Sequence, residues 1–265
     1  KNKLKKKDYY QNEYYNQQKI ANSISNTRKR QSRKIIKILK KNIFNPGEIV
    51  DFGCGKGFFL KELRLSGYKK ILGVESSNII IQELKDEFDF VRVTIKKNKL
   101  NFSSVNKNIK SEKIKTLIAL DVIEHFEVKN FLLWIENIIS SFLNPRFIFL
   151  KVPNRNGLLF NIAITLSKIG ITQKPLDQML QVNTFPPHYI YFSKRGIIEL
   201  FKRFGYELIQ TTNDLDYEMF SLGDRTSQKG ILNIFFNRII SPLLAVISTI
   251  LLKNDSIMIL LRRKL

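Results

Sequence analysis

The segment that most constrains the fold is IVDFGCGKGFFLKEL, residues 49–63. A strand-like run leads into a turn in which Gly53, Gly55 and Gly57 alternate with other residues, and an amphipathic run follows. Glycine is favoured where the backbone must turn tightly or lie against a ligand, because it has no Cβ. The segment therefore predicts a buried strand, a glycine-rich turn with a ligand on it, and the start of a helix.

Short β-branched runs alternate with helical periodicity from residue 48 onward. Strands are expected at 48–53, 69–75, 90–95, 113–121, 146–153, 206–212 and 255–265. Helices are expected at 57–66, 76–88, 127–143 and 193–205, where apolar residues recur every three or four positions. Repeated strand–helix units of this length predict a parallel sheet covered by helices on both faces.

Length and cysteine content limit the class of protein. A chain of 265 residues can form one large domain with a well-buried core. Its single cysteine, Cys54, excludes an internal disulfide and a thiolate metal cluster, which fits a reducing compartment. The first ten residues, KNKLKKKDYY, are too polar for a signal peptide. A cytoplasmic location is therefore expected.

Positive charge is concentrated near the N-terminus. The formal net charge is +22, and residues 1–41 hold 14 Lys and Arg against Asp8 and Glu13, a surplus of 12. A basic arm of this kind can attract nucleic acid, anionic lipid headgroups or an acidic substrate. The favoured interpretation is a solvated, lysine-rich face, because charge runs have low specificity.

Residues 231–252 form a long apolar run. A membrane-spanning helix needs ~20 apolar residues. The uncharged part, 239–252, has 14 residues, lies between Arg238 and Lys253, and contains Pro242. An integral span is not expected. Packing of a helix on the domain is the favoured interpretation, with an oligomer contact or an in-plane amphipathic helix at a membrane periphery as alternatives.

Two kinds of nucleotide cofactor use a strand, a glycine turn and a helix in such a sheet. A dinucleotide site requires G-x-G-x-x-G, and its third glycine position is the bulky Phe58 here. The sequence has instead Asp51 followed by three alternating glycines. Glu75 ends the second expected strand, 18 residues after Gly57, where a carboxylate can accept hydrogen bonds from both ribose hydroxyls. A cofactor with a ribose but without a pyrophosphate is favoured.

Several segments in this order resemble class I S-adenosylmethionine-dependent methyltransferases of the type 11 and type 23 groups, which include the ubiquinone-type O-methyltransferases. The turn DFGCGKG resembles motif I, ALDVIEHF (119–126) resembles motif IV, and FLKVPNRNG (149–157) matches the strand that follows it. PPHYIYFSKRGIIELFKRFGYEL (186–208) resembles the stretch near the end of these enzymes. The resemblance covers about residues 45–213.

The resemblance implies a Rossmann-like methyltransferase fold: a doubly wound, mostly parallel seven-stranded sheet with an antiparallel last strand and helical insertions. It also implies S-adenosylmethionine as cofactor. The positions that match the cofactor-binding motifs are Asp51, Gly53, Cys54, Gly55, Gly57, Glu75, Leu120 and Asp121. Cys54 needs no chemical role there, since a small residue fits the turn. The family often carries an acid near the third strand that binds adenine, and residues 92–104 contain none.

Two histidines are the candidate catalytic residues. Methyl transfer from a sulfonium mainly requires alignment of the nucleophile, but a hydroxyl acceptor benefits from a base near neutrality, for which histidine is suited. His125 and His188 both fall within the family-like segments, and Asp121 and Glu124 can orient an imidazole. A structural hydrogen bond is the alternative role of each histidine. The sequence spacing indicates no metal site.

The predicted organisation is a basic N-terminal arm and helix (1–45) and a methyltransferase domain (46–265) with insertions at about 154–190 and 217–254. The apolar insertions favour a small-molecule, sugar or lipid-linked acceptor. FPPHY (185–189) resembles the signature of amino-group methyltransferases, but that signature belongs at the end of the fourth strand. Nucleic acid is therefore not the expected acceptor. An RNA methyltransferase that uses the basic arm and a non-catalytic cofactor-binding homologue are the alternatives.

Overall fold

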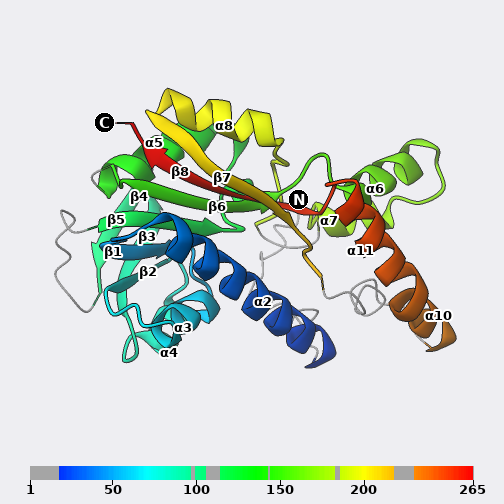
Figure 1. Cartoon of the computed structure of the whole chain (residues 1–265), viewed down its shortest axis with the longest axis horizontal. Coiled ribbons are helices and arrows are strands. Elements are labelled where there is room, and N and C mark those ends of the chain that lie inside the picture. Colours follow the sequence, from blue (N-terminus) through cyan, green and yellow to red (C-terminus); the bar gives the residue numbers. More distant parts are fainter. Residues whose placement is uncertain are drawn as a thin grey trace, which may run out of the picture.

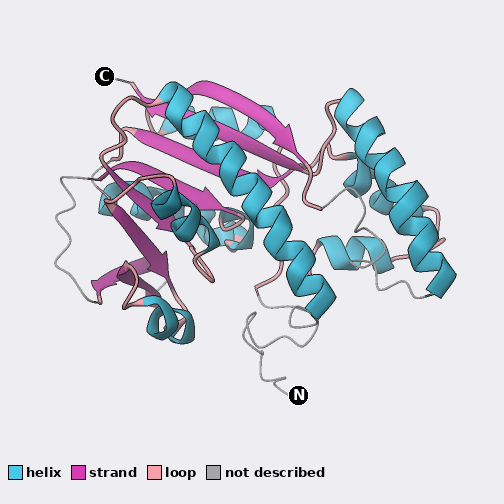
Figure 2. Ribbon diagram, turned by 60° about the horizontal axis from the view of Figure 1, so that its bottom comes forward, coloured by secondary structure: helices cyan, strands magenta, loops and turns pink. Residues whose placement is uncertain are grey.

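The computed structural model describes residues 18–96, 99–105, 114–142, 144–182, 186–217 and 230–264. Much of the predicted N-terminal arm and parts of both predicted insertions lie outside these ranges. The described chain folds around one mixed sheet that helices cover on both faces (Figures 1 and 2). Further helices extend beyond one end of the sheet (Figure 1).

The sheet has eight strands in the order β4-β3-β2-β1-β5-β6-β8-β7. Their bounds are β1 Glu48–Phe52, β2 Ile71–Glu75, β3 Asp89–Lys96, β4 Lys99–Ser104, β5 Ile114–Leu120, β6 Phe147–Pro153, β7 Tyr206–Asp214 and β8 Ser256–Arg263. The strands β1, β2, β3, β5 and β6 are parallel, whereas β4 is antiparallel to β3, and β8 is antiparallel to both β6 and β7. The predicted fold class is confirmed.

The number of strands corrects the prediction of seven. Seven strands lie within two residues of their expected ranges, and the eighth is β4. Leu100 and Phe102 of β4 pack against the core, while Lys99 and Asn101 are exposed. Two apolar residues among lysines and asparagines are too short an alternation to indicate a strand without its hairpin partner β3.

Helices cover both faces of the sheet. Successive side chains of β1 point to opposite faces, and each face has its own core. Ile49 belongs to the core beneath α2, α3 and α4, and Val50 to the core beneath α5 and α8. The bounds of these helices are α2 Gln18–Asn42, α3 Phe58–Leu65, α4 Asn78–Leu84, α5 Phe131–Ser141 and α8 Lys194–Arg203. The strands β2 and β6 are buried at every position, as expected of parallel strands covered on both faces.

Short helices follow β5, and a separate group of helices lies beyond the sheet. The 3₁₀ turns η3 (Ile123–His125) and η4 (Val128–Asn130) precede α5, which therefore begins later than the helix expected at 127–143. The separate group, called the helical lobe below, consists of α6 Leu158–Lys168, α7 Lys174–Met179, α10 Gly230–Phe235, the π-helical turn η5 Phe236–Ile240 and α11 Ser241–Ile250. Figure 1 shows α6 beside α11, with α10 extending outward.

Candidate active site

The glycine-rich turn lies at the carboxyl end of β1, before α3. Gly53, Gly55 and Gly57 have φ values of 73°, 51° and 70°, which residues with a Cβ rarely adopt. A Cβ on Gly53 would lie 2.5 Å from a methyl carbon of Val122, and one on Gly57 would lie 2.9 Å from Leu84. Glycine is therefore required here both for the backbone and for close packing.

Glu75 lies at the adjacent strand end and is bonded to the glycine turn. Its Oε2 accepts a hydrogen bond from the backbone N–H of Gly55 at 3.0 Å. Its Oε1 accepts from the backbone N–H groups of Ser76 and Ser77 at 2.7 and 2.9 Å. These donors fix the carboxylate, and Oε2 keeps a lone pair that can accept from a hydroxyl.

Asp51 and Cys54 are buried beneath the turn. Asp51 is 2% exposed, and its Oδ2 has no hydrogen-bond partner among the described residues. Burial, reinforced by the charge of Glu75, raises the pKa of Asp51 to about 8, although Arg28 opposes the change. Burial also raises the pKa of the Cys54 thiol well above its usual range. A thiol that stays protonated is a poor nucleophile, so a purely steric role suits Cys54.

Asp121 lies between two cations at the carboxyl end of β5. Lys151 of β6 donates to both of its carboxylate oxygens, at 2.7 and 2.8 Å, and Arg28 of α2 donates to Oδ2. Burial alone would raise the pKa of Asp121, but Arg28 and Lys151 outweigh burial and hold that pKa well below its usual range. Leu120, the last residue of β5, is partly buried next to it. Asp121 is therefore ionised.

Lys151 was not predicted as a site residue, although the sequence carries a signal for it. It is the single charged residue in FIFLKVP, a strand expected to be buried on both faces, and it is 1% exposed. A buried ammonium requires anionic partners. Lys151 contacts Asp216 as well as Asp121.

The basic residues of α2 also bind acidic residues at and just after the end of β7. Arg30 and Lys34 form ion pairs with Asp214 at 3.0 and 2.8 Å, and Gln31 donates to Oδ1 of Asp216 at 3.0 Å. These cations meet carboxylates of the protein itself, which none of the interpretations of the basic run had anticipated. The contacts place the N-terminal half of α2 over the carboxyl edge of the sheet.

The two histidines, predicted as separate candidates, are in contact. Their ring centroids are 4.7 Å apart, with His125 at the end of η3 and His188 before α8. The Nδ1 atom of His125 lies 3.0 Å from the carbonyl oxygen of Pro187. A carbonyl only accepts, so Nδ1 carries the proton and Nε2 is left as an acceptor. The backbone N–H of Tyr189 donates to the carbonyl oxygen of Glu124 at 2.8 Å and joins the two segments.

Glu124 completes this cluster. Its side chain is fully buried, and neither carboxylate oxygen has a hydrogen-bond partner within the described ranges. One ligand atom from each of Glu124, His125 and His188 lies within 4.8 Å of the others. Two histidines and a carboxylate form a donor set that can hold a divalent cation. Sequence spacing does not indicate a metal site here, because His188 is distant along the chain from Glu124 and His125.

Burial controls protonation in the histidine cluster. Burial, helped by the neighbouring His125, lowers the pKa of His188 to about 4. Burial likewise lowers the pKa of His125, while burial and the charge of Asp121 raise the pKa of Glu124. Both imidazoles are therefore neutral near pH 7 and can accept a proton.

The helical lobe borders the histidine cluster. The ring of Phe160 on α6 stacks on Tyr191 with a centroid separation of 3.9 Å. Tyr191 in turn lies 5.9 Å from His188, and its hydroxyl donates to the carbonyl oxygen of Met179 at 2.9 Å. One side of the site is thus lined by aromatic rings from the lobe and from the segment before α8.

Comparison with known proteins places this geometry in a family. A family model described as a methyltransferase domain matches residues 24–211. No curated protein matches the chain significantly. The match begins within α2 and ends within β7, so it includes the glycine turn, Glu75, Asp121 and both histidines. The lobe helices α10 and α11 lie outside it.

Solved structures share the fold at low sequence identity. Magnesium protoporphyrin IX methyltransferase from Synechocystis, with bound S-adenosylhomocysteine, is 14% identical with a TM-score of 0.51, over 91% of this chain and 85% of that one. The methyltransferase domain of a bacterial Hen1 protein is 12% identical with a TM-score of 0.50, over 90% and 100%. The plantazolicin methyltransferase BpumL is 15% identical with a TM-score of 0.50, over 95% and 88%.

The chain belongs to this methyltransferase family, since the family model matches more than half of it. It is an S-adenosylmethionine-dependent methyltransferase with the class I fold. The resemblance stated from the sequence motifs is thereby confirmed.

Proposed function

We propose that the enzyme methylates a hydroxyl group, with His188 or His125 as the base. The observation that carries this proposal is the buried pair of neutral imidazoles beside Glu124. A neutral imidazole accepts the proton that a hydroxyl loses as its oxygen attacks, and a positioned base contributes typically ~10²–10⁴-fold to the rate. An amine nucleophile can be uncharged without such a base.

The residues at the carboxyl edge of the sheet suit S-adenosylmethionine, which supplies an electrophilic methyl carbon when bound. Glu75 presents a fixed carboxylate that can accept from vicinal ribose hydroxyls. Asp121 and Arg28 lie together as an ion pair. The Asp121 carboxylate can accept from the ammonium group of a methionine moiety, and the Arg28 guanidinium can donate to its carboxylate. The glycine turn leaves backbone, rather than side chains, next to the ribose position.

A small-molecule, sugar or lipid-linked acceptor is supported by the wall that the lobe contributes. The stacked rings of Phe160 and Tyr191 offer an apolar surface next to His188. Apolar walls with a few polar groups are typical of small-molecule sites. Methylation of RNA through the basic N-terminal region is less well supported, because Arg28, Arg30 and Lys34 are paired with acidic side chains of the protein.

The proposal is tested by following a tritiated methyl group from S-adenosylmethionine into a fractionated cell extract. We expect label in the organic-soluble or small-molecule fraction, and an O-methyl linkage by mass spectrometry. Label in RNA, with binding that weakens steeply as salt increases, would replace this proposal with the RNA alternative. An N-methyl product would exclude the role of the histidines as base.

Chelation separates the two roles open to the histidine cluster. A base needs no metal, so turnover should change by less than about twofold after EDTA treatment, since no interaction that the base makes is removed. Loss of turnover that Mg²⁺ or Mn²⁺ restores would instead assign Glu124, His125 and His188 to cation binding.

A further inference from the structure

The helix α11 is amphipathic in the opposite sense to a helix of a soluble domain. Its buried residues are small: Ser241, Ala245 and Ser248 are at most 1% exposed. Its large apolar residues point outward, with Leu243 53% and Ile250 73% exposed. A helix that packs on a soluble core normally buries its large apolar residues and exposes its polar ones. Packing on the domain therefore does not explain the composition of α11.

The exposed apolar residues form one continuous row on the lobe. They recur every three or four positions along α10, η5 and α11, at Ile231, Phe235, Ile239, Leu243, Val246 and Ile250, with exposed fractions from 45% to 85%. The π-helical turn η5 accommodates an extra residue and keeps positions four apart on one side. This row is called the apolar stripe below. Contiguous exposed apolar surface marks interaction sites, whereas isolated residues do not.

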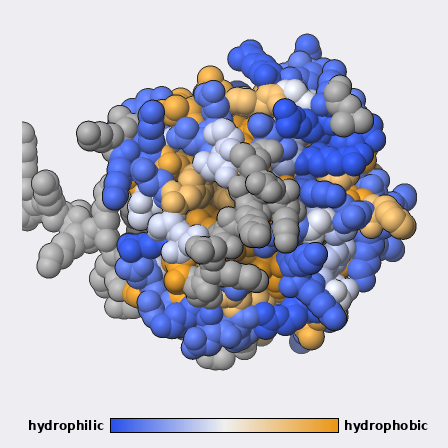
Figure 3. Space-filling model, turned by 90° about the vertical axis from the view of Figure 1, so that its left-hand side faces the viewer, coloured by the Kyte–Doolittle hydropathy of each residue, from blue (hydrophilic) through white to orange (hydrophobic). Residues whose placement is uncertain are grey.

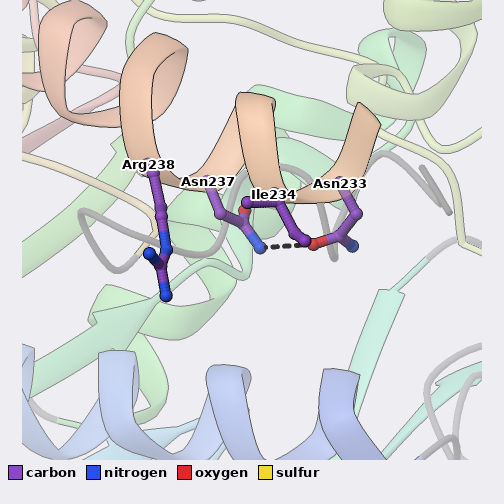
Figure 4. A pocket seen from close by; sticks show the side chains of 4 residues that line it. All are labelled: Asn233, Ile234, Asn237 and Arg238. Carbon is purple, nitrogen blue, oxygen red and sulfur yellow. Dashed lines mark hydrogen bonds between the residues drawn. The ribbon is translucent and has the colours of Figure 1, made fainter. Parts of the chain in front are cut away.

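The side of the same helix that faces α2 is mostly polar. Asn233, Ile234, Asn237 and Arg238 line a hollow of about 580 Å³ there (Figure 4). The side-chain amide of Asn237 donates to Oδ1 of Asn233 at 2.8 Å, as Figure 4 shows. The stripe therefore faces outward, while Arg238 extends from the polar side.

Charge on the lobe indicates the chemistry of its partner. Residues 155–182 and 230–254 together contain five Lys and Arg and a single acidic residue, Asp177. The range 230–254 has no acidic residue at all. The end of the molecule away from the lobe has hydrophilic residues around its rim and apolar residues toward its centre (Figure 3). An apolar stripe flanked by cations is complementary to a bilayer surface with anionic headgroups.

We propose that the helical lobe docks on an anionic membrane surface, with α10 and α11 lying in the plane of the interface and the apolar stripe inserted at the boundary between headgroups and acyl chains. Docking in this orientation leaves the lysine and arginine side chains at headgroup level. The proposal does not depend on which acceptor the enzyme methylates.

The same helix is long enough to span a bilayer, since Asn233–Ile250 has 18 residues and a mean hydropathy of 1.5. Its contacts favour the in-plane arrangement. The small-residue face is buried, the Lys253 carbonyl accepts from the backbone N–H of Leu158 at 2.7 Å, and Arg238 interrupts the span. A charge within the hydrocarbon is costly. Both ends of the insertion also return to one point, where Asp214 pairs with Ser256.

A second copy of the chain is the other occupant that the stripe could accept. Two lobes of this composition would bring like charges together, because each carries the same excess of Lys and Arg. Like charges placed opposite each other oppose association. Charge complementarity therefore favours the anionic bilayer.

Vesicle co-sedimentation tests the proposal with the full chain. We expect binding to phosphatidylcholine vesicles that contain phosphatidylglycerol and much weaker binding to phosphatidylcholine alone. The double variant L243S/I250S should bind at least ~10-fold more weakly, because two apolar side chains no longer insert. R238Q/K253Q should lose ~5-fold per charge, and more salt should weaken wild-type binding in the same direction.

Matched controls keep these outcomes decisive. F44S/L65S removes two side chains that are 105% and 81% exposed elsewhere on the molecule, and it should bind vesicles as the wild type does. A fluorophore on I250C should shift to the blue with anionic vesicles, and one on L65C should not. Cys54 is buried and leaves the introduced thiol as the labelled one.

Three results would overturn the proposal. The first is a wild-type protein that does not bind anionic vesicles. The second is binding that L243S/I250S leaves unchanged. The third is a wild-type dimer that L243S/I250S converts to a monomer, measured by light scattering, since a second copy would then cover the stripe.

Discussion

The two halves of the active site differ in how their buried polar groups are satisfied. On the side proposed to bind the cofactor, Glu75 accepts hydrogen bonds from backbone N–H groups and Asp121 is paired with two cations, although Oδ2 of Asp51 is buried without a partner among the described residues. On the side proposed to bind the acceptor, both oxygens of Glu124 and the Nδ1 of His188 are buried without a partner among the residues described. Glu75 and Asp121, which are proposed to bind the cofactor, are thus already held in place by the fold.

The difference indicates where the enzyme depends on its ligand. Buried polar groups without partners are rare in proteins and need an explanation, such as a proton, an ion or a bound molecule. Groups that are already paired keep their geometry in the absence of ligand. We therefore expect variants on the acceptor side to affect turnover and variants on the cofactor side to affect stability or cofactor affinity.

The largest expected effect is on turnover. Replacing His188 or His125, whichever is the base, with Asn should lower kcat ~10²–10⁴-fold, because the hydroxyl proton then has no acceptor. The affinity for S-adenosylhomocysteine, measured by calorimetry, should stay close to that of the wild type. Replacing the other histidine with Asn should lower kcat less, because that histidine only orients the base. Near-normal turnover in both variants would leave the histidines a structural role only.

A smaller but still large effect is expected on stability from Lys151→Met. The change leaves Asp121 and Asp216 without the ammonium that both contact, and removal of one partner of a buried ion pair costs about 3–5 kcal/mol. Denaturant unfolding would measure the loss. Lys202→Met is the matched control, because its pair with Glu199 is exposed and should contribute little to stability. Equal effects of the two changes would contradict the account of Asp121.

Acid should destabilise the acceptor side. The pKa of His188 is about 4 in the fold against an ordinary value of 6.5. The unfolded chain binds more protons between these values, so the stability due to His188 is complete above pH 6.5 and is lost as the pH falls toward 4. The wild type should lose on the order of 1–3 kcal/mol more than His188→Asn across this window. If the free energies of unfolding of the two proteins change equally with pH across this window, the contribution of His188 is excluded.

The smallest expected effect concerns the cofactor side. Glu75→Ala should weaken the binding of S-adenosylhomocysteine by ~1–3 kcal/mol, because ribose hydroxyls would lose their buried acceptor. Glu83 is an exposed acid on α4, so Glu83→Ala is the control variant and should leave the affinity for S-adenosylhomocysteine unchanged. NAD should not bind to either protein. If the two Ala variants bind S-adenosylhomocysteine equally well, Glu75 is not a ribose ligand.

Much of the cofactor side could be predicted from the sequence because it depends on short segments. The strand, the glycines at positive φ and the acid at the next strand end are each specified within a few residues. Parallel strands then bring these ends to one edge of the sheet. Such local patterns can be recognised without knowing which distant segments contact each other.

The remaining features depend on contacts between distant segments. Arg28 reaches Asp121 across 93 positions, and the ring of His125 meets a segment more than sixty residues later. No periodicity or spacing encodes such pairs. The lone lysine in β6 is an exception, because the cost of burying an unpaired charge predicts an acidic partner, although not its identity. The helices α6 and α7 lie within an insertion that the resemblance implied to be helical, but the sequence pattern gave no bounds for them.

The position of β8 in the sheet has a consequence for how the protein folds. The strand lies between β6 and β7, yet β7 ends at Asp214 and β8 begins only at Ser256. During synthesis β7 has no strand to pair with until β8 is made, and β6 keeps an unpaired edge for the same period. Closing such a long-range pairing is slow, and unpaired edges favour aggregation. A chaperone would therefore have most to protect shortly before β8 is added, and refolding of the complete chain should be limited by this step.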